Sequence, residues 1–198
     1  MASRQYRMQQ RAEATEETRT RIIRATIELH DERGVATTSQ ADVAARAGVA
    51  PATVYRHFPT LGSLVQACGS HVWELMAPPL PQDAPRLFAG LDTTPERLRR
   101  FSDEVSAFYA RGRRRLEGAR EDRGRVPELD GFLRRVEAGL EALACEALTL
   151  EQPTEQQVRL TLALTDFGVW QALRDHGITE DAVPGILTDL LSCALGYR

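Results

Sequence analysis

The spacing of apolar residues predicts helices along the whole chain and no alternating pattern typical of strands. In the first part of the chain, apolar side chains recur every three to four residues, and glycines supply natural stops at Gly34 and Gly48. Pro51 stands where the first turn of a helix tolerates proline. Four helices are therefore expected before residue 77, at residues 16–33, 40–47, 51–58 and 60–76.

A proline-rich stretch at residues 77–94 interrupts this pattern and predicts a boundary between two modules. Beyond it the helical spacing returns, although the charged, glycine-containing stretch at 111–125 predicts a short irregular helix and a turn. Further helices are expected at residues 95–113, 127–150, 153–177 and 179–197. The chain is therefore predicted to be all-α, with a smaller N-terminal and a larger C-terminal domain.

The N-terminal residues 1–15 are polar, carry three arginines and lack an apolar stretch. We expect them to form a flexible arm, followed by a domain at 16–76, the proline-rich link at 77–94, and a second domain at 95–198. The arm is interpreted as a solvated tail, and a contact with the minor groove of DNA is the alternative.

Composition places the chain among ordinary globular proteins, with 42% hydrophobic and 27% charged residues. The net charge is −3, but it is unevenly distributed: residues 1–72 carry nine arginines against seven acids, whereas residues 73–198 carry sixteen against twenty-one. Every basic residue is an arginine. This asymmetry favours an N-terminal part that meets an anion.

Several classes of protein are disfavoured by what the sequence lacks. It has no apolar run long enough to cross a membrane and no secretory signal, so a cytoplasmic location without membrane partners is expected. Three scattered cysteines show no zinc spacing, and we expect neither a metal nor a cofactor. Because no set of catalytic groups is apparent, we do not expect an enzyme; a small helical enzyme is the alternative.

The strongest pattern is at residues 38–58, whose spacing is that of a helix-turn-helix. Gly48 takes the tight turn between two short helices, and Val54 and Phe58 are expected to point inward. The opposite face of the second helix suits the major groove of DNA, with small residues, hydroxyls, an imidazole and a guanidinium. The predicted DNA-binding residues are Thr38, Ser39, Pro51, Ala52, Thr53, Tyr55, Arg56 and His57. Since similar short helices occur in proteins that never touch DNA, ordinary surface positions are the alternative.

Within this segment the run Ala-Gly-Val-x-x-x-Thr-Val-Tyr-Arg-His-Phe-Pro, preceded by Asp-Val-Ala and by a helix ending in Arg-Gly, resembles the signature of TetR-family transcriptional regulators. The resemblance covers about residues 18–75. Two positions depart from it: Ala50 replaces the usual serine before the recognition helix, so Pro51 must help to start that helix. Leu61 replaces the usual lysine, which puts one phosphate contact in doubt.

The resemblance implies a helical regulatory domain that binds a small molecule and dimerises, so that two protomers repress transcription from a palindromic operator. A ligand pocket, if present, should be mainly apolar. Its candidate lining residues recur at helical spacing, and hydrophobic core is the alternative for each of them. They are Phe101, Val105, Phe108, Tyr109, Phe132, Val136, Phe167 and Trp170.

Dimerisation is favoured by the last two expected helices, at about residues 155–197. Both are apolar over more than one face, whereas a helix at the edge of a domain needs only one apolar stripe. A homodimer packed as a four-helix bundle would bury the excess, and a central position within one protomer is the alternative. A regulator of the same type without a small-molecule inducer remains the alternative function.

Overall fold

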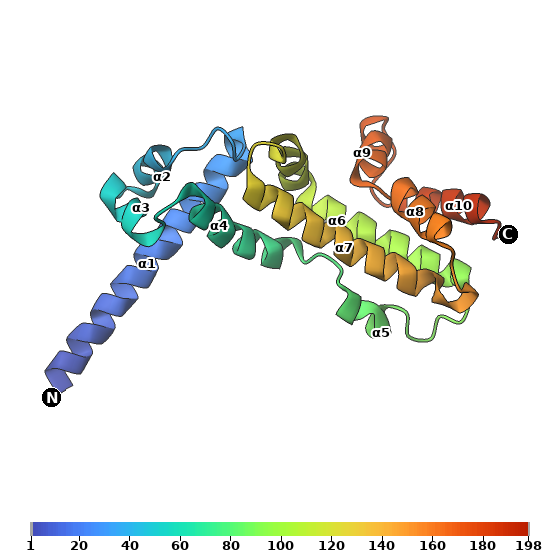
Figure 1. The fold of residues 1–198 in the computed structure, drawn as a ribbon, viewed down its shortest axis with the longest axis horizontal. Helices are drawn as coiled ribbons and strands as arrows, with labels where there is room; N and C mark the ends of the chain where they lie inside the picture. The colour runs from blue at the N-terminus through green and yellow to red at the C-terminus, as the bar shows by residue number, and fades with distance from the viewer. Residues whose placement is uncertain (1, 198) are drawn as a thin grey trace. The chain divides into compact units, whose positions relative to one another are not determined.

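The computed structural model describes the backbone of residues 2–197 and the side chains of residues 5–150 and 152–197 (Figure 1). This described part is helical and contains no strand, as the apolar pattern predicts. Its contacts divide it into two compact units. The first consists of Met1–Glu74 with Arg114–Leu133, and the second of Leu75–Arg113 with Arg134–Arg198.

The first unit is built on four helices. They are α1 (Ala2–Arg33), α2 (Gln40–Ala47), α3 (Pro51–His57) and α4 (Leu61–Met76). The bounds of α2 are those expected from the sequence, because a serine caps its start and Gly48 ends it. One cluster of buried side chains joins the four helices and forms the core of this unit: Ile22, Ala25, Leu29, Val43, Ala44, Ala47, Val54, Phe58 and Leu64.

Helix α1 begins far earlier than the apolar pattern indicates, so residues predicted to form an arm are helical. The side chains of residues 5–17 are all exposed, and apolar packing therefore gave no signal for a helix there. Local interactions stabilise the segment instead. The Tyr6 hydroxyl accepts from the Gln10 amide, one turn later at 2.9 Å, and most residues around them are good helix formers.

The proline-rich link contains two short helical pieces, η1 (Pro81–Asp83) and α5 (Ala84–Leu87). Helix α6 (Thr94–Asp122) then runs nine residues beyond the expected end at Arg113. The short irregular helix and turn predicted at 111–125 are therefore corrected: the helix is continuous to Asp122, and the turn is confined to residues 123–125. Two isolated glycines cost about 1 kcal/mol each in a helix, and the long Arg, Leu and Glu side chains around them favour it.

The C-terminal helices are α7 (Pro127–Leu148), the short η2 (Thr149–Glu151), α8 (Glu155–Leu164), α9 (Phe167–Asp175) and α10 (Val183–Leu195). A single helix was predicted at 153–177, but the structure breaks it between α8 and α9. Asp166 causes the break by capping α9, because its carboxylate accepts from the backbone of Gly168 at 2.8 Å. In the described part of the chain, no helix is both long and apolar enough to cross a membrane.

Candidate nucleic-acid interface

The turn between α2 and α3 has the local geometry that its sequence dictates. Gly48 adopts φ 64° and ψ 40°, the left-handed conformation that ends α2 with a tight turn. Ala50 makes no side-chain cap at the start of α3, and Pro51 occupies its first turn. The expectation that proline replaces the missing serine in starting this helix is therefore confirmed.

Helix α3 is held against the unit from its inner face and from its end. Val54 is fully buried and Phe58 is 3% exposed, as the motif predicts. The buried amide of Gln40 donates to the backbone carbonyl of Phe58 over 2.7 Å. This contact was missed from the sequence, because nothing in the pattern distinguishes a buried glutamine at the start of a helix from an exposed one. It ties the first residue of α2 to the end of α3.

The outer face of α3 is open. Pro51, Ala52, Tyr55 and Arg56 are exposed, and Tyr55 retains 52% of its accessible surface. The side chains of Thr53 and His57 are half-buried and lie one turn apart. The six predicted positions on this helix thus share one accessible surface, which combines hydroxyl, imidazole and guanidinium donors with two small apolar residues.

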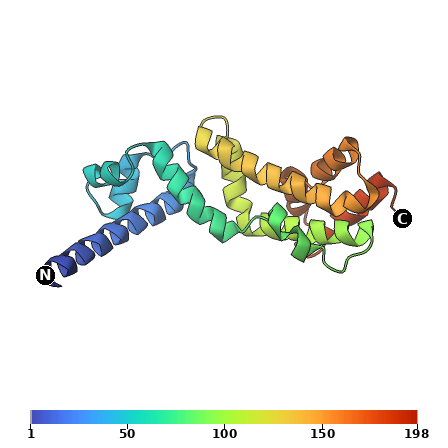
Figure 2. The same ribbon diagram turned by 60° about the horizontal axis from the view of Figure 1, so that its bottom comes forward.

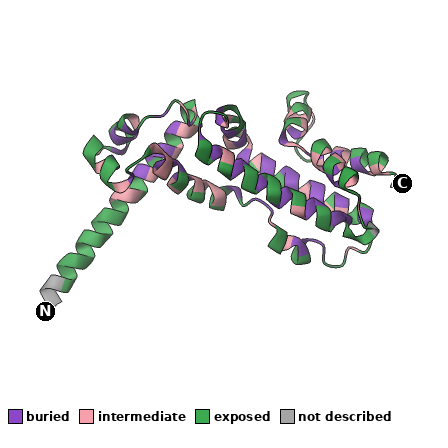
Figure 3. Ribbon diagram, in the orientation of Figure 1, coloured by how far each residue is buried: buried purple, intermediate pink, exposed green. Residues whose placement is uncertain are grey.

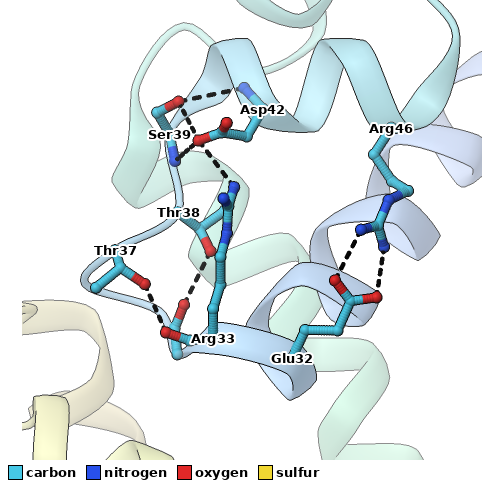
Figure 4. A network of polar contacts seen from close by, with 8 residues as sticks. Glu32, Arg33, Thr37, Thr38, Ser39, Asp42 and Arg46 are labelled. Carbon is cyan, nitrogen blue, oxygen red and sulfur yellow. Dashed lines mark hydrogen bonds and ion pairs between the residues drawn. The ribbon is translucent and has the colours of Figure 1, made fainter.

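The two predicted contacts before α2 have different environments. Ser39 is exposed and caps α2 in a capping box with Asp42, whose carboxylate accepts from the Ser39 backbone over 3.1 Å (Figure 4). Thr38 is 3% exposed, and its hydroxyl donates to the Gly34 carbonyl over 2.8 Å. Its side chain therefore stabilises the loop and offers no surface to DNA, so we correct its assignment as a contact.

Ion pairs fix α2 on the end of α1. The Arg46 guanidinium spans both carboxylate oxygens of Glu32 at 2.8 and 2.7 Å, and that hydrogen bonding lowers the pKa of Glu32 (Figure 4). Arg33 contacts the carboxylate of Asp42 at 2.8 Å. Hydrogen bonds from Ser39 and the nearby Arg33 lower the pKa of Asp42. These contacts keep the start of α2 in one position relative to α1.

The turn that follows α1 is held by Asp122, which lies 86 residues after Ala36 in the sequence. One carboxylate oxygen of Asp122, at the end of α6, accepts from the backbone N–H groups of Val35 and Ala36 at 2.8 and 2.9 Å. Asp122 is only 7% exposed. Within the same unit, the guanidinium of Arg115 contacts both oxygens of Asp31 at 3.2 and 2.9 Å. The end of α6 is thus part of the first unit.

A half-buried histidine of α1 and a buried cysteine of α4 lie next to each other. His30 Nδ1 is 3.6 Å from the Cys68 sulfur. Burial lowers the pKa of His30 from 6.5 to about 4, although the carboxylates of Asp31 and Asp122 oppose that shift. Burial also raises the pKa of the Cys68 thiol to about 12. Both groups are therefore neutral near pH 7 and act as core residues.

Leu61 shows what the unusual residue at the start of α4 does. Its side chain is half-buried and packs against the core cluster of the first unit. The position therefore adds apolar contact where a lysine would offer an ammonium group to phosphate. The consequence is that other groups must supply that phosphate contact.

The eight candidate ligand-lining residues do not form one group. All are buried. In the second unit, the Tyr109 ring lies edge-on to Phe167 with centroids 5.3 Å apart, and Phe167 stacks on Trp170 at 5.9 Å. Phe132 belongs to the first unit, where it packs against Trp73 at 5.4 Å. Phe132 therefore belongs to a different unit from the aromatic cluster of Tyr109, Phe167 and Trp170.

Three buried polar groups of the second unit were missed from the sequence. The Ser102 and Ser106 hydroxyls and the indole Nε1 of Trp170 have no hydrogen-bond partner among the described residues. Ser102, Ser106 and Tyr109 are spaced four and three residues apart, so they share one face of α6. Buried polar groups normally have partners, so these three unpaired groups of the second unit call for an explanation.

Comparisons with known proteins agree with the helix-turn-helix geometry. Residues 22–68 match the sequence model of a family described as bacterial regulatory proteins, tetR family. These residues include α2, α3 and most of the core of the first unit. No curated protein sequence matches the chain.

Solved structures extend the likeness over most of the chain. The multidrug binding protein EbrR, complexed with proflavin, is 26% identical, with a TM-score of 0.57 over 87% of this chain and 99% of that one. FadR from Bacillus subtilis, in complex with stearoyl-CoA, is 19% identical, with a TM-score of 0.61 over 87% and 96%. The TetR-like regulator LfrR from Mycobacterium smegmatis, in complex with proflavine, is 24% identical, with a TM-score of 0.52 over 90% and 96%.

Proposed function

We propose that this chain, whose residues 22–68 match the tetR family of bacterial regulatory proteins, represses transcription by inserting α3 into the major groove of operator DNA. The observation that carries the proposal is the open outer face of a helix whose inner face and end are fixed. A rigid helix with exposed donors can hold base edges in register. A cytoplasmic location follows from this role.

Each exposed side chain has a role set by its chemistry. Arg56 pairs with guanine or neutralises a phosphate, and the hydroxyl of Tyr55 donates to a base edge or a phosphate. Pro51 and Ala52 allow close approach and contact with a thymine methyl group. Thr53, His57 and Ser39 complete the donor set, and Thr38 is left out because its side chain is buried.

We further propose a homodimer that pairs the C-terminal helices of two protomers. On α8 and α10, apolar side chains beyond those of the core are half-buried or exposed, and Leu190 is 42% exposed. Such a surface suits a twofold partner. Two copies of α3 would then read half-sites of a palindromic operator about 34–36 Å apart. The half-exposed apolar residues are Leu160, Leu162, Leu164, Ile186 and Leu195.

The second unit is proposed to bind a largely apolar effector at the aromatic cluster of Tyr109, Phe167 and Trp170. The orphaned hydroxyls of Ser102 and Ser106 and the Trp170 indole would anchor a few polar atoms of that molecule. Complexes of the similar EbrR and LfrR with proflavin and of FadR with stearoyl-CoA support a small-molecule effector. By binding one of two states more tightly, the effector would disfavour the DNA-binding spacing.

The direct test removes the two donors at the end of the recognition helix. We expect Tyr55→Ala combined with His57→Ala to abolish the retardation of a duplex selected from a random pool, with an unchanged circular dichroism spectrum. A matched control, Gln66→Ala with Ser70→Ala, alters two exposed residues of α4 and should bind like the wild type. Undiminished binding by the α3 variant would overturn the role of α3.

The effector is tested by thermal denaturation with proflavine, stearoyl-CoA and a panel of apolar compounds as probes. A compound that raises the melting temperature and releases the duplex supports the proposal, and Trp170→Phe, which removes the indole donor, should weaken its effect. If every stabilising compound leaves DNA bound, the chain is a regulator without an inducer. The mass of the protein in solution, compared between wild type and Leu190→Glu, tests the dimer.

A further inference from the structure

The N-terminal half of α1 has no partner within the first unit. Every side chain from Gln5 to Glu17 is exposed, and this part of the helix extends free of the rest of the unit in both views (Figures 1 and 2) and is green throughout in Figure 3. At 1.5 Å per residue these residues span about 20 Å. Because this part of α1 is polar and packs against no other element, its whole surface is open to an external partner.

The register of α1 indicates which side of this extension faces such a partner. Arg7 precedes Ala25 by 18 residues, and Arg11 precedes Leu29 by the same number, which is five turns of 3.6 residues. Ala25 and Leu29 are each 4% exposed and pack in the core with α2 and α3. The face of α1 that meets the helix-turn-helix thus continues beyond it as a row of arginines.

The charges on this face are left uncompensated. Residues 1–12 contain three arginines and no acid. Along the described part of α1, the first ion pair joins Arg19 to Glu16 at 3.7 Å, beyond both Arg7 and Arg11. The face of α1 that is apolar inside the core carries guanidinium groups where the helix is exposed. A partner surface that complements these groups is anionic rather than apolar.

We propose that this arginine face, defined by Arg7 and Arg11, binds the phosphodiester backbone of the same DNA duplex that α3 reads. The inference rests on the proposed function, and the face of α1 that carries Arg7 and Arg11 is the one that packs, further along the helix, in the core with α2 and α3. Guanidinium groups match the geometry of phosphate oxygens. The contact also supplies phosphate binding that Leu61 cannot provide.

The test measures DNA binding by the full-length Arg7→Gln/Arg11→Gln variant at several salt concentrations. Phosphate contacts carry no sequence information, so the variant should lose affinity equally for a selected duplex and for a random one. Each lost contact should reduce the slope of log K against log salt by about 1, or about 2 for the pair. An unchanged slope would overturn the proposal.

A rotated variant tests whether the helical face matters. Arg7→Gln/Arg11→Gln/Gln5→Arg/Gln9→Arg has the same net charge as the wild type, but its two new arginines lie on roughly the opposite side of α1. We expect it to bind as weakly as the double variant. Full recovery of affinity and slope would show that a mobile charged tail suffices, and would sink the assignment of this face.

The outcomes separate this inference from the proposed function. If the wild type selects no duplex at all, the proposed function fails. If Tyr55→Ala/His57→Ala abolishes binding while Arg7→Gln/Arg11→Gln leaves affinity and slope unchanged, only the arginine face is overturned. If the double variant instead forms a smaller oligomer in solution and its salt slope is unchanged, the arginine face binds a second copy of the chain. That result also overturns the inference.

Discussion

The two units differ in how they treat buried polar groups. In the first, buried or loop-forming polar groups are tied to the backbone, as in the contacts of Gln40 and Asp122. Among the described side chains, it leaves one buried polar atom without a partner, His30 Nε2, whereas the second unit leaves six, including those of Ser102 and Trp170. Under the proposed function, the first unit presents one fixed surface and satisfies its own polar groups, whereas the unpaired groups of the second unit would remain available to a bound molecule.

The largest effect should come from emptying the core of one unit only. Phe58→Ala removes a buried ring from the first unit and should cost about 3–5 kcal/mol of unfolding free energy. Of the two tryptophans, Trp73 lies in the first unit and Trp170 in the second, so fluorescence of single-tryptophan variants follows each separately. The Trp73 transition should shift most. The matched Phe101→Ala should shift that of Trp170, and equal shifts of both would mean that the units unfold as one.

Asp122→Ala should have the next largest effect, because it leaves the N–H groups of Val35 and Ala36 without their acceptor. We expect a loss of about 2–4 kcal/mol of stability, together with weaker DNA binding. The control is Asp122→Asn, whose amide oxygen can still accept. Melting temperature and gel retardation measure both effects. Full DNA affinity in the alanine variant would show that the turn after α1 does not position α2 and α3.

Acid should destabilise the first unit through His30. The pKa of His30 is about 4 in the folded state and 6.5 in the unfolded chain. As the pH falls, His30 is therefore protonated in the unfolded chain before it is protonated in the folded state. Stability present above pH 6.5 is therefore lost between 6.5 and about 4, by up to about 3 kcal/mol. His30→Leu should remove this part of the pH dependence in denaturation followed through Trp73. The same acid loss in the variant would assign it to carboxylates.

The smallest effect is expected from removing the N-terminal cap of a helix, and the two units offer equivalent caps for comparison. Ser39 and Asp42 form a capping box at α2, and Thr154 and Gln157 form one at α8. Ser39→Ala and Thr154→Ala should each cost about 1 kcal/mol. Only the first should weaken DNA binding in gel retardation, because α2 supports α3 and Ser39 also belongs to the proposed donor set. Equal DNA affinities would show that neither the cap nor the Ser39 hydroxyl contributes to DNA binding.

The sequence predicted the helix-turn-helix closely, because Gly48, Pro51 and the buried Val54 and Phe58 each act within a few residues. It failed where the decisive interaction was distant or weak. The extension of α1 contains no apolar stripe, and α6 continues where glycines suggested a turn.

The same limit applies to the candidate site. The outer face of α3 was predictable, because its residues are adjacent in sequence. The burial of Thr38 depends on how its loop folds back to Gly34, and the role of Asp122 depends on a pairing across 87 residues. No local pattern encodes either, so both required the tertiary structure.

The division of α6 between the units has a practical consequence for protein engineering. A designer who wants new inducer responses would join residues 1–76 to the regulatory domain of another protein by cutting in the proline-rich link. That cut discards Asp122 and Arg115, which belong to the DNA-binding unit although they follow the link in sequence. A chimera that also transplants residues 114–133 keeps the helix-turn-helix together with the residues of α6 that support it.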